Sequence, residues 1–563
     1  MQMMVSTIKK LFCCCILVSA AFVTRELYRC EFLLPSSSLE TTLDQLPRDQ
    51  FPRDQLPRDQ LPRDQLPRDQ LPRDQLQHDQ LPRGQLPREH LPRDQLPRDR
   101  DSFLSDWCRL QRSRVDWKGL LGNCRNKMAW KQREVNYILN RTDANKSFIA
   151  RWDIKPKGEF SRFYIQTVTR KGVLKRTGGD SWRVYIRQGP ASLAPMVIDQ
   201  DDGTYEVMFL ALESGTYAAQ VFLDYTLCDG FRDPPEDWYI RGDIQGHKQE
   251  PGMLGYIYDD FIKAPLQGGI TVEFDIKDSS KTNGFFKYIQ PLLNGTGQAG
   301  LSQLSCDIEC SLLWNGFGRW VNNSWKPYIP EDIYNQKHVD SENTKLQTLM
   351  IYGDSVGVHY HSLASRRPLC RKMFHKCNKK YMWTYDASWQ GNDSKYFNQS
   401  IVLDEIKHVF RNPPMRGNRS VFLFNVGIHY PISLNFTTYQ LLIDNIAKML
   451  TQETGTEGKE RVLSGQALSI WRSNTAIEAE YLTKFFPQFN FTEWRFHTNP
   501  RSQLFHKYAT SAMCMTGTPV LDMYPLTAAW PNGTRDSVHY TDKAIEPAIR
   551  VLERYLAEYL LKS

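Results

Sequence analysis

The sequence has no strong excess of charge of either sign and no run of lysine and arginine. Its formal net charge is only +8 over 563 residues, so it lacks the concentrated positive charge with which proteins hold nucleic-acid phosphates. This absence argues against nucleic-acid binding. With 41% apolar residues, the composition is that of a globular protein, and the length favours two or three domains over one core.

The apolar run near the N-terminus is shorter than a typical membrane-spanning helix. It covers residues 11–23 (LFCCCILVSAAFV), about 20 Å of helix against roughly 30 Å of hydrocarbon. This length fits a signal peptide, with a cleavage site after Val18-Ser19-Ala20. A short signal-anchor is the alternative, since membranes of the secretory pathway are thinner. We prefer the anchor, which predicts a Golgi type II membrane protein; cleavage would make the protein secreted.

Cysteine spacing typical of zinc ligands is also missing. Eight of the 12 cysteines lie beyond residue 100, and an even number in an oxidising compartment indicates up to four disulfides, with the pairing left open. The intervals Cys306–Cys310 and Cys370–Cys377 fit zinc poorly, so we expect no metal site. Sequons of the type N-x-[ST] predict a glycoprotein. They lie at Asn140, Asn145, Asn294, Asn322, Asn392, Asn398, Asn418, Asn435, Asn490 and Asn532.

A repeated pentapeptide close to Leu-Pro-Arg-Asp-Gln fills residues 46–100. Proline in nearly every copy excludes helix and central strand, and arginine and aspartate nearly cancel in charge. After a tail and hydrophobic segment in residues 1–30, we therefore expect residues 31–100 to form a disordered, extended stalk. The upper reach of the pentapeptide segment alone, residues 46–100, is about 170 Å at about 3.1 Å per residue. A binding array for a repeated partner is the alternative.

Residues 145–230 follow a joining segment (101–144) and have the alternation of apolar and polar positions typical of strands. Gly-Pro, Asp-Asp-Gly and Ser-Gly turns separate these runs, a spacing that predicts a β-sandwich. The apolar positions expected to share its core are Trp182, Val184, Ile186, Tyr205, Val207, Phe209, Tyr217 and Val221. Residues 231–299 are expected to form a connecting region.

Apolar strands alternate with helical stretches in residues 300–563. The expected strands are 348–353, 420–427, 467–471 and 518–523, and the expected helices are 439–450, 475–486 and 544–562. This alternation predicts an α/β domain with a mostly parallel sheet. In such sheets, ligands bind at the carboxyl ends of the strands.

Candidate catalytic residues fall at these strand ends. Ser355 follows the strand TLMIYG, within Gly-Asp-Ser, and is either a nucleophile or an ordinary helix-capping hydroxyl. Asp536 and His539 lie one turn apart just before the last helix. The carboxylate could therefore orient the imidazole, whose other nitrogen would act as base toward the serine. A helix cap and an exposed histidine are the alternative for this pair.

Oxyanion donors are expected on the loops between these residues. Asn425 ends an apolar strand before Gly427, so its amide could donate into the site together with the backbone N–H of Ser355. Gly391 lies in a loop between the two and is a candidate for a further backbone donor. His429 is an alternative base, but it has no adjacent carboxylate in the sequence.

Taken together, Gly-Asp-Ser after the first strand, an asparagine at a strand end and Asp-x-x-His before the final helix resemble the SGNH/GDSL hydrolase superfamily, and more closely its PC-esterase branch. With the G-G-D…G-P…D-G-T-Y…G-T-Y pattern of an immunoglobulin-like, filamin-type sandwich, residues 100–563 resemble the neurexophilin and PC-esterase domain family. The serine at position 537 stands where the family often has glycine.

The resemblance implies an SGNH-type O-acetyltransferase acting on cell-surface carbohydrate, without a bound cofactor and with acetyl-CoA as the acyl donor. Sialylated glycans are among the acceptors it implies. An acetyl esterase of the same fold is the first alternative. A non-enzymatic, neurexophilin-like adhesion or ligand glycoprotein is the second.

Overall fold

The computed structural model describes residues 102–130, 137–234, 261–278, 284–293, 304, 306, 308–329, 345–382, 397–451, 467–481 and 496–562. These residues belong to the second of two units into which the chain divides, Leu91–Ser563. The predicted N-terminal hydrophobic segment and pentapeptide stalk lie outside the described residues. Among the helices of the described part, none combines the length and apolar character that crossing a bilayer requires.

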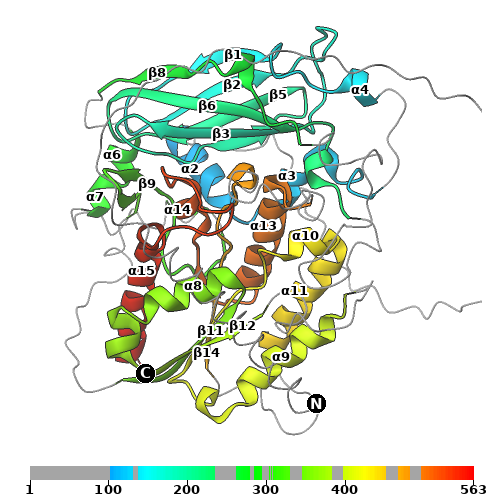
Figure 1. The fold of residues 1–563 in the computed structure, drawn as a ribbon. Helices are drawn as coiled ribbons and strands as arrows, with labels where there is room; N and C mark the ends of the chain where they lie inside the picture. The colour runs from blue at the N-terminus through cyan, green and yellow to red at the C-terminus, as the bar shows by residue number, and fades with distance from the viewer. Residues whose placement is uncertain are drawn as a thin grey trace, which may run out of the picture. The chain divides into compact units, whose positions relative to one another are not determined.

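Two antiparallel sheets face each other in the first part of the described chain (Figure 1). The first has the strand order β1 (Phe148–Asp153), β2 (Phe160–Gln166), β5 (Thr204–Leu210) and β4 (Met196–Asp199). The second comprises β3 (Ser181–Gln188), β6 (Gly215–Tyr225) and β7 (Ala264–Pro265), with β8 (Val272–Ile276) also paired to β6. The expected β-domain is therefore present.

The core of this β-domain lies between the two sheets, as the alternation predicted. All eight apolar residues expected to share the core are buried in one cluster. The predicted boundary at residue 230 was wrong, because β7 and β8 belong to the presumed connecting region. The five residues of β8 do alternate between buried and exposed positions, but so short a run becomes recognisable as a strand only through its pairing with β6.

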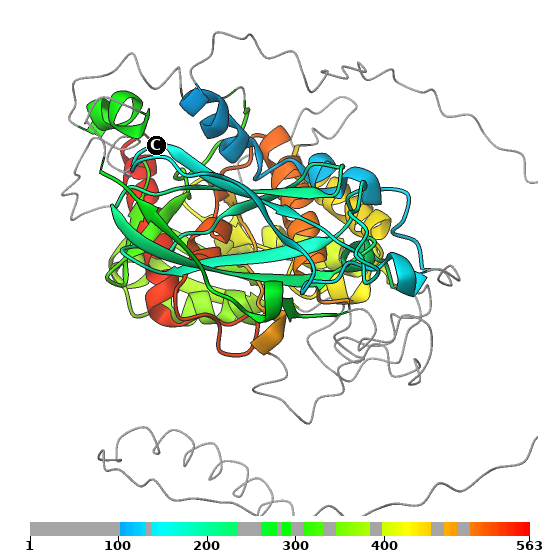
Figure 2. The same cartoon turned by 90° about the horizontal axis from the view of Figure 1, so that it is seen from above.

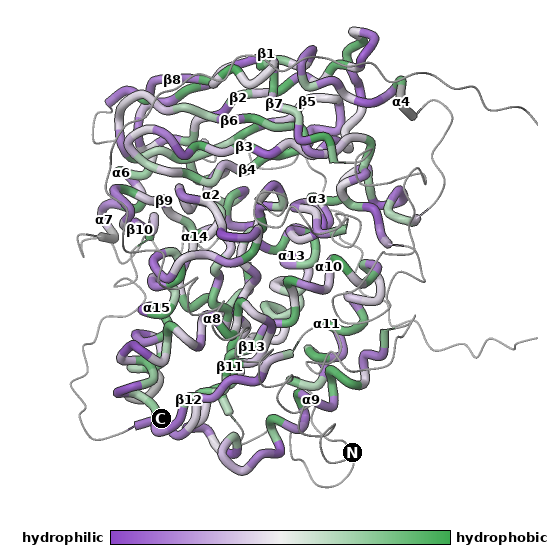
Figure 3. Tube along the Cα trace, in the orientation of Figure 1, coloured by the Kyte–Doolittle hydropathy of each residue, from purple (hydrophilic) through white to green (hydrophobic). Residues whose placement is uncertain are grey.

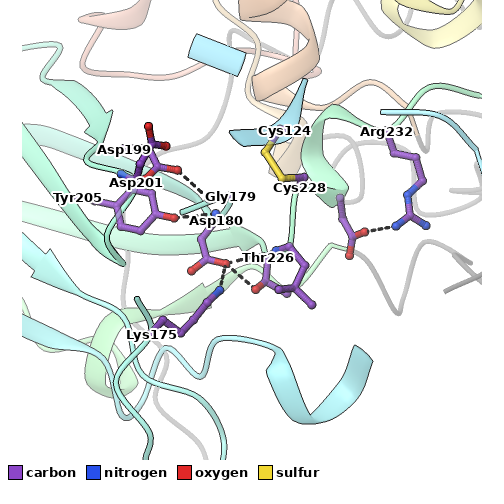
Figure 4. Close-up of a disulfide and its surroundings, with 12 residues drawn as sticks. Cys124, Lys175, Gly179, Asp180, Asp199, Asp201, Tyr205, Thr226, Cys228 and Arg232 are labelled. Atoms are coloured by element: carbon purple, nitrogen blue, oxygen red, sulfur yellow. Dashed lines mark hydrogen bonds and ion pairs between the residues drawn. A yellow bond between two sulfur atoms is a disulfide. The ribbon is translucent and has the colours of Figure 1, made fainter. Parts of the chain in front are cut away.

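One corner of the β-domain explains the Gly-Gly-Asp pattern (Figure 4). The carboxylate of Asp180 accepts hydrogen bonds from Lys175 (2.7 Å) and Thr226 (2.5 Å). Gly179 has a positive φ of 102°, and a Cβ there would stand 2.8 Å from the sulfur of Cys228. Glycine is therefore needed where the Cys124–Cys228 disulfide passes over the turn.

A parallel five-stranded sheet forms the centre of the C-terminal part, as the strand–helix alternation predicted. Its strand order is β12 (Phe374–Tyr381), β11 (Leu346–Gly353), β13 (Val421–Phe424), β14 (Leu468–Arg472) and β15 (Val520–Leu521). The sequence did not predict β12, because this edge strand is largely exposed and hydrophilic (Figure 3). An edge strand buries fewer side chains, so its apolar signal is weak.

Helices cover both faces of this sheet (Figures 1 and 2). One face packs against α9 (Gln399–Arg411), α11 (Phe436–Thr451) and α13 (Asn499–Met515). The other packs against α8 (Ser355–Ala364), α14 (Tyr524–Ala528) and α15 (Asp542–Lys562). Side chains of β11 alternate between the two cores, with Tyr352 in the first and Ile351 in the second. The structure is thus an α/β domain with a buried parallel sheet.

The predicted helix over residues 475–486 was wrong at its start. Residues 473–478 have no regular structure and lead into a short 3₁₀ turn at Ala479–Tyr481; the rest of the prediction lies outside the described residues. This segment makes its hydrogen bonds with distant parts of the chain instead of within a helix of its own. For example, Ala476 N–H donates to Thr527 Oγ1 (2.9 Å).

Shorter elements complete the two parts and the region between them. They are α2 (Ser102–Arg112), α3 (Trp117–Leu121), α4 (Tyr137–Asn140), α6 (Gly284–Tyr288), α7 (Gln290–Leu293), the hairpin of β9 (Gly318–Val321) and β10 (Ser324–Pro327), and α10 (Tyr430–Ser433). The backbone of Ser192, in the β-domain, exchanges hydrogen bonds of 2.8 and 3.0 Å with Trp320 of β9. Ser192 Oγ also donates to the Ala529 carbonyl at the end of α14 (2.8 Å), so the β-domain and the α/β domain are in direct contact.

All eight cysteines beyond residue 100 form disulfides. The four pairs are Cys108–Cys306, Cys124–Cys228, Cys310–Cys514 and Cys370–Cys377. Four disulfides in one chain are typical of proteins that fold in oxidising compartments, where such bonds form and persist. The structure thus supports an extracellular or secretory-pathway protein.

Candidate active site

The turn after β11 answers whether the serine merely caps a helix. The cap of α8 is Asp354, whose Oδ1 accepts hydrogen bonds from the backbone N–H groups of Val356 (3.0 Å) and Gly357 (3.4 Å). Ser355 is the first residue of the helix, so its hydroxyl is left to make contacts elsewhere. Gly353 has a positive φ of 153° and packs closely against the next strand end. A Cβ at this position would stand 3.2 Å from the Asn425 carbonyl oxygen.

The three residues predicted as a triad lie together. His539 Nε2 is 2.8 Å from Ser355 Oγ, and His539 Nδ1 is 2.7 Å from Asp536 Oδ2. The carboxylate can only accept, so Nδ1 carries the proton and Nε2 accepts from the serine hydroxyl. Asp536 Oδ1 also accepts from the His539 backbone N–H (2.9 Å). The predicted proximity is confirmed, while the catalytic roles remain predictions.

The carboxyl of Asp536 is held in its charged form. Burial acts to raise the pKa of Asp536, but the hydrogen bond and charge of His539, with backbone N–H donors of the same turn, outweigh it and lower the pKa. A charged acceptor at this position favours the Nδ1–H tautomer and stabilises an imidazolium. The arrangement can therefore accept a proton from Ser355 Oγ at His539 Nε2.

A small apolar cluster packs the two halves of the site against each other. It consists of Val356, Ile428, Ile477 and Val538, all buried. Each of the four is adjacent in sequence to a polar residue at or near the site, such as Ser355 beside Val356 and His539 beside Val538. The cluster therefore joins the serine turn to the loop that carries the histidine.

Asn425 does not play the direct part expected of it. Its Nδ2 donates to the Arg472 carbonyl (2.8 Å) and to Asn474 Oδ1 (2.8 Å), and the residue is 2% exposed. Both amide hydrogens are thus engaged, and neither faces an oxyanion in this arrangement. The sequence could not reveal this, because Arg472 and Asn474 meet Asn425 only through the pairing of β13 with β14.

Asn474 is the amide that this arrangement leaves with a donor to offer. Because the Arg472 carbonyl can only accept, it fixes which way the Asn425 amide points, and Asn474 must then present its oxygen to Asn425. Its Nδ2 is buried and has no hydrogen-bond partner among the described residues. Glycine at position 427 makes room for it, since a Cβ there would stand 1.9 Å from Asn474 Oδ1.

Arg472 lies beneath the serine turn. Its Nη2 is 3.7 Å from the positions that a Cβ would occupy at Gly353 and at Gly357, and the side chain is buried. Neither terminal nitrogen of its guanidinium has a hydrogen-bond partner in the described part of the chain. Burial lowers the pKa of Arg472, an effect that the nearby carboxylate of Asp354 opposes. The guanidinium places a positive charge near the serine.

His429, the alternative base, is buried beside the site. Burial, and secondarily the charge of His539, lowers the pKa of His429 to about 3. Its neighbour His497 has a pKa lowered to about 3, by burial first and by His429 second. Both are neutral at physiological pH. Gly391, the candidate third donor, lies outside the described residues.

Sequence reasoning missed Arg472, Asn474 and Glu478. Arg472 ends β14, and Asn474 and Glu478 follow it in the segment Arg-Ser-Asn-Thr-Ala-Ile-Glu; the same strand-end argument that selected Asn425 could have selected them. The expected helix over residues 475–486 hid Glu478, while Arg472 and Asn474 lie just before that range. Among the described residues, no group of three or more His, Cys, Asp and Glu side chains could hold a metal ion.

No known family model matches this chain. Three solved structures are each similar to 15% of this chain. The filamin domain of Lin-41 is 15% identical, with 81% of that chain covered and a TM-score of 0.13. The adhesin InvE of Yersinia pseudotuberculosis is 17% identical, with 24% of that chain covered and a TM-score of 0.12; domains 4 and 5 of the S-layer protein SbsC are 11% identical, with 47% of that chain covered and a TM-score of 0.13.

Proposed function

We propose that this protein is a serine-dependent O-acyltransferase that transfers acetyl groups to glycans of the secretory pathway or cell surface. The observation that carries the proposal is the hydrogen-bonded series Ser355–His539–Asp536 at the carboxyl edge of the parallel sheet. A serine whose hydroxyl donates to an imidazole oriented by a carboxylate is an activated nucleophile. Chemistry at such a serine is acyl transfer.

In the proposed reaction, His539 Nε2 takes the hydroxyl proton while Ser355 Oγ attacks the carbonyl carbon of an acetyl thioester such as acetyl-CoA. The tetrahedral intermediate collapses, and the leaving thiolate takes the proton from His539. A sugar hydroxyl then gives its proton to His539 and attacks the acetyl-serine. Collapse of the second intermediate returns the proton to Ser355 and releases the acetylated sugar.

We assign stabilisation of the oxyanion to the backbone N–H of Ser355 and to Asn474 Nδ2, with Asn425 as the residue that holds Asn474. Each such donor contributes about 3 to 4 kcal/mol in the transition state. The guanidinium of Arg472 supports the same negative charge from beneath the turn. The support for this assignment is that Asn474 has a buried donor with no hydrogen-bond partner among the described residues.

A carbohydrate acetyl esterase is the second candidate. The side chains of His539 and Asp536 are 29% and 19% exposed, so water can reach the acyl-serine, and hydrolysis would then replace transfer. The proton movements are the same, with water in place of the sugar hydroxyl. Which acceptor reacts depends on how well a sugar is positioned.

We further propose that the chain belongs to the neurexophilin and PC-esterase domain family, with a filamin-type β-domain and an SGNH-like α/β domain. The supports are the three ordered motifs and the two kinds of sheet. Placement as a Golgi type II membrane protein through residues 11–23 completes the proposal; the four disulfides agree with the lumenal side of that membrane.

The decisive experiment compares the lumenal part, from residue 101 onward, with its Ser355→Ala variant. Both are secreted from glycosylating cells and assayed for hydrolysis of p-nitrophenyl acetate and for acetyl transfer from acetyl-CoA to mixed sialylated glycans. Loss of the nucleophile should lower kcat by about four to six orders of magnitude. Ser362→Ala, an exposed serine of the same helix, is the matched control and should leave kcat unchanged.

Serine-dependent gain of acetyl on the glycan would establish the transferase. Serine-dependent release without transfer would establish the esterase. Equal activity of wild type and Ser355→Ala on both substrates would overturn the assignment of Ser355 as nucleophile. If the folded wild type were inert on both, a non-enzymatic adhesion or ligand protein would become the better interpretation.

A further inference from the structure

The loop that carries Asp536 and His539 is not held by regular secondary structure. Ser537, between them, has a positive φ of 86°, a conformation that costs free energy for a residue other than glycine. Inside the loop, Ser537 N–H donates to Thr534 Oγ1 (3.1 Å) and Arg535 N–H donates to the His539 carbonyl (2.9 Å). Such a loop needs external support to keep one conformation.

Glu478 supplies that support from the neighbouring loop. Its Oε2 accepts a hydrogen bond from Thr534 N–H (3.1 Å), and its own backbone N–H donates to the Ser537 carbonyl (2.8 Å). The two hydrogen bonds hold the catalytic loop at Thr534 and at Ser537, on both sides of Asp536. Glu478 is 2% exposed, so its carboxylate requires a positive partner to be stable where it lies.

The positive partner comes from the β-domain. Arg187 Nη2, on β3, makes a hydrogen-bonded ion pair with Glu478 Oε1. The side chains of the pair are 14% and 3% exposed, so water screens their attraction little. The guanidinium also stacks on the ring of Tyr185, 3.7 Å from its centroid, which limits its motion.

We propose that the β-domain is a working part of the catalytic site, because Arg187 positions Asp536 and His539 through Glu478. The inference rests on the proposed function, which gives the loop its importance. Arg187 touches no reacting atom and is a positioning residue. The β-domain would on this view be an obligatory support for catalysis, in contrast to a spacer or a separate binding module.

A second contact across the same interface offers a comparison. Tyr185 donates to Glu480 Oε1 (2.8 Å), and Arg183 pairs with the same carboxylate at 2.6 Å. Glu478 makes two hydrogen bonds to the catalytic loop, whereas the Tyr185 hydroxyl bonds to Glu480 instead. Tyr185→Phe therefore removes an interface hydrogen bond but keeps the ring on which Arg187 stacks.

The test measures kcat and KM for p-nitrophenyl acetate in the full lumenal part, for wild type, Arg187→Gln, Arg187→Lys and Tyr185→Phe. Small displacements of catalytic groups cost up to about 100-fold in rate, so we expect Arg187→Gln to lower kcat about 10- to 100-fold with KM nearly unchanged. Arg187→Lys should recover most of the rate because it restores the charge. Tyr185→Phe should resemble wild type.

Glu478→Gln is the second variant, in case Arg187→Gln leaves a buried carboxylate that prevents folding. It removes the charge but keeps an oxygen that can accept from Thr534 N–H, so it should fold and still lose rate 10- to 100-fold through loss of the ion pair, on the scale of small catalytic displacements. Unchanged kcat in folded Arg187→Gln or Glu478→Gln would overturn the proposal. An equal loss in Tyr185→Phe would also overturn it, because the effect would then be general loosening of the interface.

Hydrogen exchange separates failure of this inference from failure of the proposed function. In Arg187→Gln, amides in peptides covering residues 534–540 should exchange at least ten times faster than in Tyr185→Phe, whether or not the wild type turns over substrate. If the wild type proved inactive, faster exchange in Arg187→Gln would still support the coupling and remove only the catalytic consequence. Unaltered exchange in these peptides would overturn the coupling itself.

Discussion

Single residues at the carboxyl edge of the sheet determine what chemistry this site can perform. Asp354 takes the capping role that would otherwise occupy the serine hydroxyl, and Asn425 takes the hydrogen bonds that fix the neighbouring Asn474. Each supporting residue thus frees or aims another one. The consequence is that a substitution without direct contact to Ser355 can still disturb the arrangement around it.

Gly427→Ala tests this dependence between residues. A Cβ at position 427 would stand 1.9 Å from Asn474 Oδ1 and 2.5 Å from its Nδ2, so Asn474 must leave its place. We expect kcat to fall about 10²- to 10³-fold, the cost of losing one oxyanion donor, with KM nearly unchanged.

The matched comparison is Asn474→Ala and the Gly427→Ala/Asn474→Ala double variant. If both changes act on the same donor, the double variant should lose no more than either single one, because their effects are not additive. Additive losses, or wild-type kcat in Gly427→Ala, would contradict the assignment of Asn474 as donor.

At the scale of elements, the parallel sheet gathers residues that are far apart in the chain. The carboxyl ends of β11, β13 and β14 lie side by side, so the loops after them meet although they are separated by long helices. Disulfides fix other elements around this sheet. Cys310–Cys514 ties the segment before β9 to the end of α13, across 204 positions, while Cys370–Cys377 closes only 7.

Removing these two disulfides should have unequal effects. In the chain-entropy picture, the long loop contributes about 5 kcal/mol and the short one about 2.5 kcal/mol to the free energy of unfolding. Paired Cys→Ala variants of each disulfide, unfolded with urea and followed by tryptophan fluorescence, should therefore show the larger loss for Cys310–Cys514. Equal losses would indicate that native contacts, and not loop closure, dominate both.

At the scale of the whole molecule, stability should depend on pH through buried histidines. Burial lowers the pKa of His429 and His497 to about 3 and that of His506 to about 4. In the unfolded chain each has a pKa of about 6.5. Between these values the unfolded state binds protons that the folded state does not, so the free energy of unfolding falls as the pH is lowered from about 6.5 toward 4.

The expected slope is about 1.4 kcal/mol per pH unit for each buried histidine in that window. Scanning calorimetry from pH 7 to 4.5 should show the decline in Tm, and His506→Gln should make it shallower whatever its effect on Tm at pH 7. His506 is chosen because it lies in α13, outside the triad, where its ring stacks on that of Tyr524 from α14. An unchanged slope in His506→Gln would contradict a neutral buried His506.

The fold and the triad could be predicted to different depths. Strands such as β11 and β13 were predictable because central parallel strands are continuous apolar runs, and the β-domain because its strands alternate. The edge strand β12 was missed because it buries few side chains, and the late strand β8 because its alternation covers only five residues. Ser355, Asp536 and His539 were predictable because each belongs to a local motif at a strand end or before a helix.

By itself, the sequence determined the alternation of strands and helices, the identity of the three triad residues and the even number of cysteines. These depend on local periodicity, local motifs and composition. Only the tertiary structure decided which cysteines pair, that Asn474 and not Asn425 offers its amide, and that Arg187 reaches Glu478 from the β-domain. Partners so distant in the chain meet through sheet register and domain packing, which no local pattern encodes.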